Sequence, residues 1–142
     1  MLLAETRRTA LHGSLSLLLA AAACTWSIGP CRVAVKGLSM APTLRPGDRL
    51  LVRPVRRLRR GDLVVVCDPG EPGRWVVKRV AALPGQAVAV AGRELTAGGG
   101  IVVLGDNLAH STDSRDYGAV PLSGVHGKAW YRYAPAERSG RL

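Results

Sequence analysis

Ser39 lies in a stretch whose residue types could present a hydroxyl for catalysis, Val35-Lys36-Gly37-Leu38-Ser39-Met40-Ala41-Pro42-Thr43-Leu44. Gly37 comes two residues before it and Pro42 three residues after it, and both residue types bend the backbone so that the hydroxyl can point outward. A serine hydroxyl is a weak nucleophile at neutral pH and needs a base within hydrogen-bond reach. The rest of the chain must therefore supply that base.

Lys78 is one of only three lysines and lies in an apolar stretch, Trp75-Val76-Val77-Lys78-Arg79-Val80. In an extended strand the side chains alternate, so Lys78 shares a face with Val76 and Val80 while Arg79 points to the other face. If the lysine face is buried, loss of hydration lowers the ammonium pKa from about 10.4. The pattern therefore indicates a lysine that could act as a general base near neutral pH.

A third polar stretch follows, beginning with Gly105-Asp106-Asn107. It continues with the polar or turn-forming residues Ser111, Asp113, Ser114, Arg115, Tyr117 and Gly118. By itself such a cluster is typical of an ordinary polar loop. Its meaning depends on the two earlier stretches.

In this order the three stretches resemble the type I signal peptidases, which are membrane-bound serine endopeptidases with a Ser/Lys dyad. The motifs are G-x-S-M-x-P-T, K-R-V-x-x-x-P-G and G-D-N-x-x-x-S-x-D-S-R-x-x-G, and the resemblance covers about residues 33–129. It implies a mainly β catalytic core of the signal-peptidase and LexA type, preceded by a single N-terminal transmembrane helix. It also implies catalysis by Ser39 and Lys78 through an acyl-enzyme, with no metal and no cofactor.

The resemblance assigns further roles around this dyad. Ser111 is expected to hydrogen-bond the lysine amine. Supporting ion pairs are expected from Asp106, Arg79, Asp113 and Arg115. The Ser39 backbone N–H is the expected oxyanion donor, whereas Gly37 stands where some relatives have a second, hydroxyl donor. Met40 is expected to wall the substrate pocket, although a purely structural methionine fits the sequence as well.

The substrates that the resemblance implies are precursor proteins with Ala or a similar residue one and three positions before the cut. The connection from Gln86 to Gly100 is short, so the large extra β domain of longer relatives is missing. A maturation protease of narrow specificity is therefore an alternative to a general signal peptidase. The sequence sets no oligomeric state.

The N-terminal part divides at residues 10 and 29. Residues 1–10 carry Arg7 and Arg8 and form the expected cytoplasmic N-terminus. The uncharged run 11–29 is long enough to span a bilayer, and residues 30–142 form the expected peptidase domain. We expect a single-pass protein of the cell membrane whose catalytic domain lies on the extracytoplasmic side. A cleaved signal sequence and a buried soluble helix are the alternatives for 11–29.

After Pro30 the chain consists of short runs rich in Val and Leu, separated by Gly and Pro. The turns are expected at Pro46-Gly47-Asp48, Arg60-Gly61-Asp62, Asp68-Pro69-Gly70, Pro84-Gly85 and Gly98-Gly99-Gly100. The expected strands are 32–35, 49–52, 63–67, 74–80, 87–90, 101–104 and 128–133. One mainly β domain follows from this pattern.

The positive net charge of the chain favours an anionic binding partner. The formal net charge is +10, and residues 53–60 carry five arginines. No nucleic-acid motif accompanies them, so we expect membrane phospholipid rather than nucleic acid. The same run also fits a solvated loop. The three cysteines, Cys24, Cys31 and Cys67, form no disulfide framework, and a Cys31–Cys67 bridge is left open.

Three other functions compete. A LexA-like self-cleaving regulator shares the Ser/Lys chemistry, but it should carry a DNA-binding or other module at its N-terminus. The N-terminal part of this chain is instead apolar. A Ser/His/Asp hydrolase would use His110 or His126, yet no G-x-S-x-G motif surrounds Ser39. A catalytically inactive, membrane-tethered β binding module would not need both Ser39 and Lys78.

Overall fold

The computed structural model describes residues 30–142. The predicted N-terminal segment (1–10) and the predicted membrane anchor (11–29) lie outside the described residues. Within the described part, no helix has the length and apolar character that crossing a bilayer requires.

Strands make up most of the secondary structure of residues 30–142, in agreement with the mainly β prediction. They are β1 (Cys31–Ala34), β2 (Arg49–Arg53), β3 (Leu63–Cys67), β4 (Trp75–Ala82), β5 (Ala87–Val90), β6 (Arg93–Thr96), β7 (Val102–Leu104), β8 (Val125–Ala134) and β9 (Gly140–Arg141). The helical segments are single turns: η1 (Leu108–His110), α2 (Ser114–Tyr117), η2 (Leu122–Gly124) and η3 (Ala136–Arg138).

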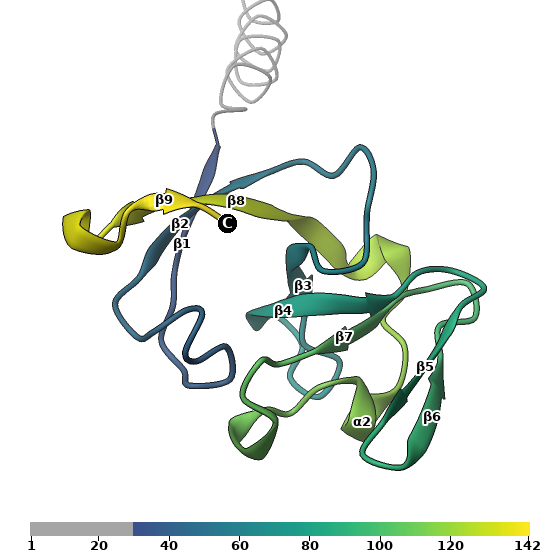
Figure 1. Cartoon of the computed structure of the whole chain (residues 1–142). Helices are drawn as coiled ribbons and strands as arrows, with labels where there is room; N and C mark the ends of the chain where they lie inside the picture. The colour runs from purple at the N-terminus through teal and green to yellow at the C-terminus, as the bar shows by residue number, and fades with distance from the viewer. Residues whose placement is uncertain (1–29) are drawn as a thin grey trace, which may run out of the picture.

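One antiparallel sheet holds the fold together in the order β1-β2-β8-β3-β4-β7, with β9 added to β8. Strand β8 is central because its later residues pair with β2 and its earlier residues pair with β3. Figure 1 shows the result: β1, β2 and β9 lie on one side of β8, and β3, β4 and β7 lie on the other. The β5–β6 hairpin forms a separate sheet that projects beyond β4 and β7.

Strand β3 is buried on both faces, and four of its five residues are buried. Its sequence, Leu-Val-Val-Val-Cys, is a continuous apolar run rather than an alternating one, which is typical of a strand covered on both sides. Leu63 and Val65 face one core cluster, and Val64 and Val66 face the second. Full burial of each such side chain contributes about 1.5–3 kcal/mol.

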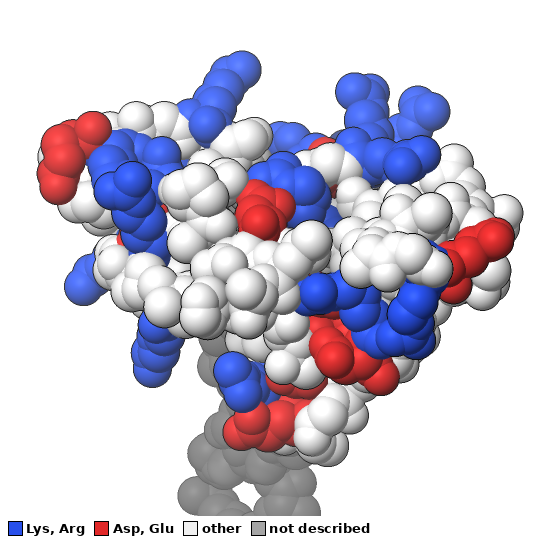
Figure 2. Space-filling model, turned by 60° about the horizontal axis from the view of Figure 1, so that its bottom comes forward, with Lys and Arg blue, Asp and Glu red and all other residues white. Residues whose placement is uncertain are grey.

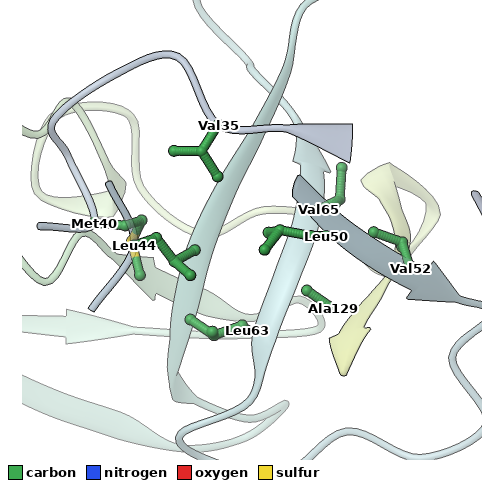
Figure 3. Close-up of a cluster of buried hydrophobic side chains, with 8 residues drawn as sticks. All are labelled: Val35, Met40, Leu44, Leu50, Val52, Leu63, Val65 and Ala129. Carbon is green, nitrogen blue, oxygen red and sulfur yellow. The ribbon is translucent and has the colours of Figure 1, made fainter. Parts of the chain in front are cut away.

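The first core cluster lies between the sheet and the segment that carries Ser39 (Figure 3). Met40 and Leu44 come from that segment and are 2% and 0% exposed. They pack with residues of β2, β3 and β8, namely Leu50, Val52, Leu63, Val65 and Ala129, and with Val35. This packing fixes the serine segment on the sheet.

The strand predictions differ from the structure in a few places. Strand β6 was not predicted, because its sequence, Arg-Glu-Leu-Thr, is polar and the turn before it is Ala91-Gly92. Both turn residues have positive φ, which a hairpin turn of this type requires but which Asn-Gly signals better than Ala-Gly. The short strand β9 was also not predicted. Cys31 and Cys67 are free, so the bridge left open between them is not formed.

Candidate active site

The Ser39 segment is a compact turn between β1 and β2. Leu44 N–H donates to the Met40 carbonyl at 2.8 Å, and Ala41 N–H donates to the Leu38 carbonyl at 3.0 Å. Met40 points into the core while Leu38 is 52% exposed, so Ser39 lies half-buried between an inward and an outward side chain. This arrangement leaves the serine side chain at the surface of the core.

Asp48 fixes the C-terminal end of the Ser39 segment, just before β2. Its carboxylate is 1% exposed and accepts from Arg132 Nη1 at 3.2 Å and from Arg138 Nη1 at 2.9 Å. Arg132 Nη1 also donates to the Thr43 carbonyl at 2.9 Å. The C-terminal part of the chain therefore holds the serine segment in place.

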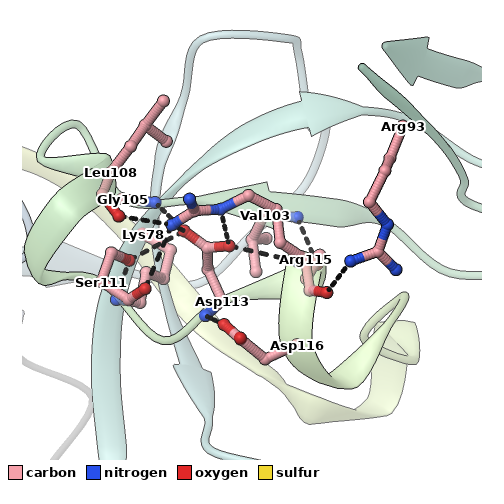
Figure 4. Close-up of polar contacts among 10 residues, drawn as sticks. Lys78, Arg93, Val103, Gly105, Leu108, Ser111, Asp113, Arg115 and Asp116 are labelled. Atoms are coloured by element: carbon pink, nitrogen blue, oxygen red, sulfur yellow. Dashed lines mark hydrogen bonds and ion pairs between the residues drawn. The ribbon is translucent and has the colours of Figure 1, made fainter. Parts of the chain in front are cut away.

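Lys78 lies in β4 and is 3% exposed, as the alternation of β4 predicts. Its Nζ donates to Ser111 Oγ at 3.0 Å, which is the hydrogen bond that the resemblance implies (Figure 4). Burial lowers the pKa of the Lys78 ammonium, and the nearby Asp113 carboxylate opposes part of that shift. The site thus contains a buried lysine with its proton held less tightly than usual.

Asp113 organises the other side of Ser111. Its Oδ2 accepts from Ser111 Oγ at 2.8 Å and from Gly105 N–H at 2.9 Å, and its Oδ1 accepts from Arg115 Nε at 2.9 Å (Figure 4). Burial alone raises the pKa of this carboxyl, but these hydrogen bonds outweigh burial and hold the pKa below its usual value. Asp113 also caps α2 through a capping box with Asp116. A charged, fully buried carboxylate therefore orients the Ser111 hydroxyl.

Arg79 follows Lys78 and points to the opposite face of β4. Its guanidinium makes two parallel hydrogen bonds to Asp106, at 2.7 and 2.6 Å, and donates from Nη1 to the Gly61 carbonyl at 2.8 Å. Burial raises the pKa of Asp106, but hydrogen bonds from Arg79 and Thr43 outweigh it, so the net shift is downward. This bidentate pair ties the loop after β7 to β4.

Gly105 brings the serine segment and the third stretch together. A methyl group at Gly105 would come within 2.2 Å of Ser111 Oγ and 2.6 Å of the Ser39 carbonyl oxygen. Asn107 N–H donates to that same carbonyl at 2.9 Å, and its side-chain amide donates to the Leu38 carbonyl at 3.2 Å. The backbone of Ser39 and the hydroxyl that contacts Lys78 therefore meet in the space that a side chain at this position would fill.

A cleft of about 500 Å³ opens beside Ser39. Its walls are residues 33–37, at and after β1, and residues 74–77, where β4 begins. β1 is an edge strand, and β7 pairs with β4 only from Arg79 onward, so both walls have backbone groups that the sheet does not use. Met40 and Ser39 complete the lining.

Four of the predicted site residues lie in one hydrogen-bonded network, and two more form a separate pair. Lys78, Ser111, Asp113 and Arg115 are joined by hydrogen bonds, and Arg79 and Asp106 form their own pair. The hydrogen bonds of residues 30–142 do not include one between Ser39 and Lys78. Ser39 joins the network through its backbone.

Neither His110 nor His126 takes part in this network. His126 lies against Trp75 with a ring distance of 4.7 Å, and His110 is exposed at the end of η1. The structure shows two further residues that hold the Ser39 segment and that the motif alone does not single out. They are the closely packed Gly105 and the side-chain amide of Asn107. The Ser114 hydroxyl makes a further backbone contact and accepts from Val103 N–H at 2.9 Å. Spacing alone gives no sign of such backbone contacts.

Comparison with known proteins gives a family match. Residues 7–100 and 97–134 match the family described as "Signal peptidase, peptidase S26". The matched segments include all three motifs of the site.

Individual relatives agree with the family match. The chain is 38% identical over 122 residues to the mitochondrial ATP-independent inner membrane protease subunit 1a of Arabidopsis thaliana, covering 76% of this chain and 73% of the relative. It is 36% identical over 125 residues to the mitochondrial inner membrane protease subunit 2 of Mus musculus, covering 79% and 71%. It is 33% identical over 139 residues to the probable signal peptidase I-1 of Synechocystis sp., covering 73% and 71%.

Proposed function

The chain belongs to the signal peptidase, peptidase S26 family, and we propose that it is a membrane-anchored serine endopeptidase that cleaves signal peptides or similar N-terminal segments from exported precursors. The observation that carries this proposal is the burial of Lys78 in a hydrogen-bonded site beside the Ser39 segment. A serine peptidase without a histidine base needs such a lysine.

In the proposed mechanism, Ser39 attacks the carbonyl carbon of the scissile peptide bond. Neutral Lys78 takes the hydroxyl proton and passes it to the leaving amine, which gives an acyl-enzyme and a free amino terminus. Water then attacks the ester with Lys78 again as base, and Ser39 is regenerated. The Ser111 hydroxyl, held by Asp113, keeps the amine oriented through the cycle.

The oxyanion needs donors near Ser39. The backbone N–H of Ser39 is the first candidate, because the attacking oxygen and this amide belong to the same residue. Gly37 offers no side-chain donor, and a Cβ added there would meet no atom within 4 Å. The site therefore has free space where a second donor could be placed.

The cleft between residues 33–37 and 74–77 is suited to an extended peptide. Free strand edges on both walls can pair with substrate backbone, as in β-strand addition. In such a peptide alternate side chains point the same way, so two residues spaced by one face the floor near Met40. Met40 forms part of the cleft lining, and we propose that the residues one and three positions before the cut are Ala or similarly small.

A membrane location is supported by the uncharged run 11–29 and by relatives whose names place them at the mitochondrial inner membrane. We propose the cell membrane, with the peptidase domain on the extracytoplasmic side. Narrow specificity is supported by the short connection between β4 and β7, whose regular structure is the small β5–β6 hairpin. A maturation protease with few precursors is thus the second candidate.

The test is cleavage of a secretory precursor with an Ala-x-Ala site by the full chain in detergent. Ser39→Ala and Lys78→Ala are each expected to abolish product, whereas Ser139→Ala and Arg141→Ala, whose side chains form no hydrogen bond with the described site residues, retain it. Cleavage that survives both site substitutions would exclude the dyad. If the parent gives no product, trapping of membrane precursors on Ser39→Ala separates narrow specificity from an inactive binding module.

A further inference from the structure

Residues 53–60, here called the arginine loop, carry positive charge that the protein does not neutralise. Its five arginines are all exposed, and none forms an ion pair with a carboxylate of the described residues. The nearest acidic residue in sequence, Asp62, is already engaged by Lys128 Nζ at 2.5 Å and by the Arg59 backbone N–H at 2.9 Å. Figure 2 shows more Lys and Arg than Asp and Glu on the face in view.

Four of these arginines surround one hollow. Its volume is about 730 Å³, and its basic lining consists of Arg53, Arg56, Arg57, Arg59 and Lys128. We call it the arginine hollow. Planar guanidinium groups converging on one space are suited to phosphate oxygens, which they can bind two at a time.

The loop is anchored at its end rather than freely solvated. Leu58 packs against the second core cluster. Gly61 N–H donates to the Val80 carbonyl at 2.8 Å, and the Gly61 carbonyl accepts from Arg79. The guanidinium groups therefore project from a backbone that is attached to β4.

A second hollow, of about 490 Å³, lies on the other side of the same residues. It shares Pro54, Val55, Arg56 and Arg57 with the arginine hollow, but its other walls are mainly apolar and include Leu58, Leu83 and Leu122. Leu122 is 48% exposed there. A ligand that fits both hollows must combine an anionic group with an apolar chain.

The loop also begins at the side of the domain where a membrane is expected. Val52 pairs with Cys31, one residue after the start of the described chain, so the loop leaves the sheet next to the junction with residues 1–29. Arg53 lies over the Trp130 ring at 5.7 Å. Trp, Tyr and Arg together are typical of the boundary between lipid and water.

We infer that the arginine loop binds an anionic glycerophospholipid, with the phosphate in the arginine hollow and an acyl chain on the neighbouring apolar hollow. This inference rests on the proposed membrane location of the protein. Nucleic acid fits less well, because its phosphates need an extended basic track and have no use for an apolar hollow.

The test uses the full chain in neutral detergent micelles containing equal amounts of phosphatidylglycerol and phosphatidylcholine. Native mass spectrometry counts the lipids that stay bound. The test variant carries Arg56→Gln, Arg57→Gln and Arg59→Gln. The matched control carries Arg45→Gln, Arg49→Gln and Arg141→Gln, which removes the same charge from exposed positions outside the arginine hollow.

Parent and control should prefer phosphatidylglycerol, and the loop variant should lose roughly a hundredfold of that preference at low salt. Equal loss in both variants would mean that only net charge matters and would overturn the site. Competition by headgroup glycerophosphoglycerol as strong as by the whole lipid would overturn the role of the apolar hollow. Tighter binding of a short single-stranded oligonucleotide would overturn the lipid assignment.

A measurement on the parent protein covers the case in which the loop variant does not fold. Phenylglyoxal modifies exposed arginines, and phosphatidylglycerol should slow the modification of Arg56, Arg57 and Arg59 but not of Arg45 and Arg49. Equal rates with and without the lipid would contradict the inference. Precursor cleavage by the same preparation separates the peptidase proposal from the lipid-binding proposal. A preference for phosphatidylglycerol without cleavage would contradict only the peptidase proposal.

Discussion

Lys78 and Lys128 flank the same residue, Val64, from the neighbouring strands β4 and β8, yet their ammonium groups lie in opposite surroundings. Lys78 is buried and bound to a neutral hydroxyl, whereas Lys128 is ion-paired with Asp62 and faces the arginine hollow. Burial in the first environment lowers the pKa of the Lys78 ammonium, whereas the second environment holds the Lys128 ammonium in an ion pair. The comparison teaches that the burial of an ammonium and the presence of a carboxylate partner, rather than its register in the sheet, distinguish the two lysines.

The largest effect is expected for Lys78→Met. Cleavage should fall by at least about a thousandfold, because the base is lost. The free energy of unfolding should stay unchanged or rise by about 1 kcal/mol, because an ammonium is no longer buried. Precursor cleavage and urea unfolding of the full chain measure the two. Strong destabilisation would show that Lys78 has a structural role that this comparison misses.

Gly105→Ala tests how tightly the residues around Lys78 and Ser111 are packed. The added methyl would overlap Ser111 Oγ and the Ser39 carbonyl, so kcat is expected to fall by about 10- to 100-fold. Gly99→Ala is the matched control, because a Cβ there meets no atom within 4 Å. Equal kcat values for the two variants would contradict the close contact.

The pH dependence separates the two regions directly. Because burial lowers the Lys78 pKa and only the neutral amine acts as base, cleavage should rise with pH up to that depressed pKa and then level off. Below it, each pH unit should cost about tenfold in kcat/KM. Phosphatidylglycerol retention should stay flat over the same range, because arginine remains charged. A rate that falls as pH rises would point to a protonated group instead.

Lys128→Met is expected to destabilise the fold by about 1–2 kcal/mol, since it leaves the largely buried Asp62 carboxylate without its ion pair. Urea unfolding of Lys128→Met beside Lys78→Met gives the measurement. Changes of opposite sign in the free energy of unfolding would support the difference between the two lysines. Equal destabilisation by both substitutions would contradict it.

The smallest effect is a gain. Gly37→Ser places a hydroxyl in free space near the proposed oxyanion site, so kcat is expected to rise about two- to tenfold. Gly37→Ala is the control, because it fills the same space without a donor. A serine variant no faster than the alanine variant would show that the backbone already supplies enough stabilisation.

The sequence predicted local features better than contacts. Strands β3 and β5 were predicted with their bounds, because apolar runs there end at clear turn residues. The three motifs indicated which residues belong together through the family resemblance. The close approach of Gly105 to Ser39 and Ser111 could not be predicted, because it depends on how two loops far apart in the chain pack.

The arginine loop shows the same limit. Its composition raised two interpretations, a solvated loop and a lipid contact, and could not decide between them. The neighbouring apolar hollow is built partly from Leu83 and Leu122, which lie far from the loop in sequence. Only the folded chain brings them beside the arginines.

The central place of β8 in the sheet bears on when the enzyme becomes active during its synthesis. A ribosome delivers Ser39 first, Lys78 next and Ser111 later, and β8, which joins the β2 side to the β3 side, emerges near the end. Until then the serine segment also lacks Arg132 and Arg138, its two anchors on Asp48. A nascent chain that has not yet delivered β8 and Arg138 therefore lacks both the strand that joins the two halves of the sheet and the anchors of the serine segment, so the proposed site forms only after Arg138 has been made.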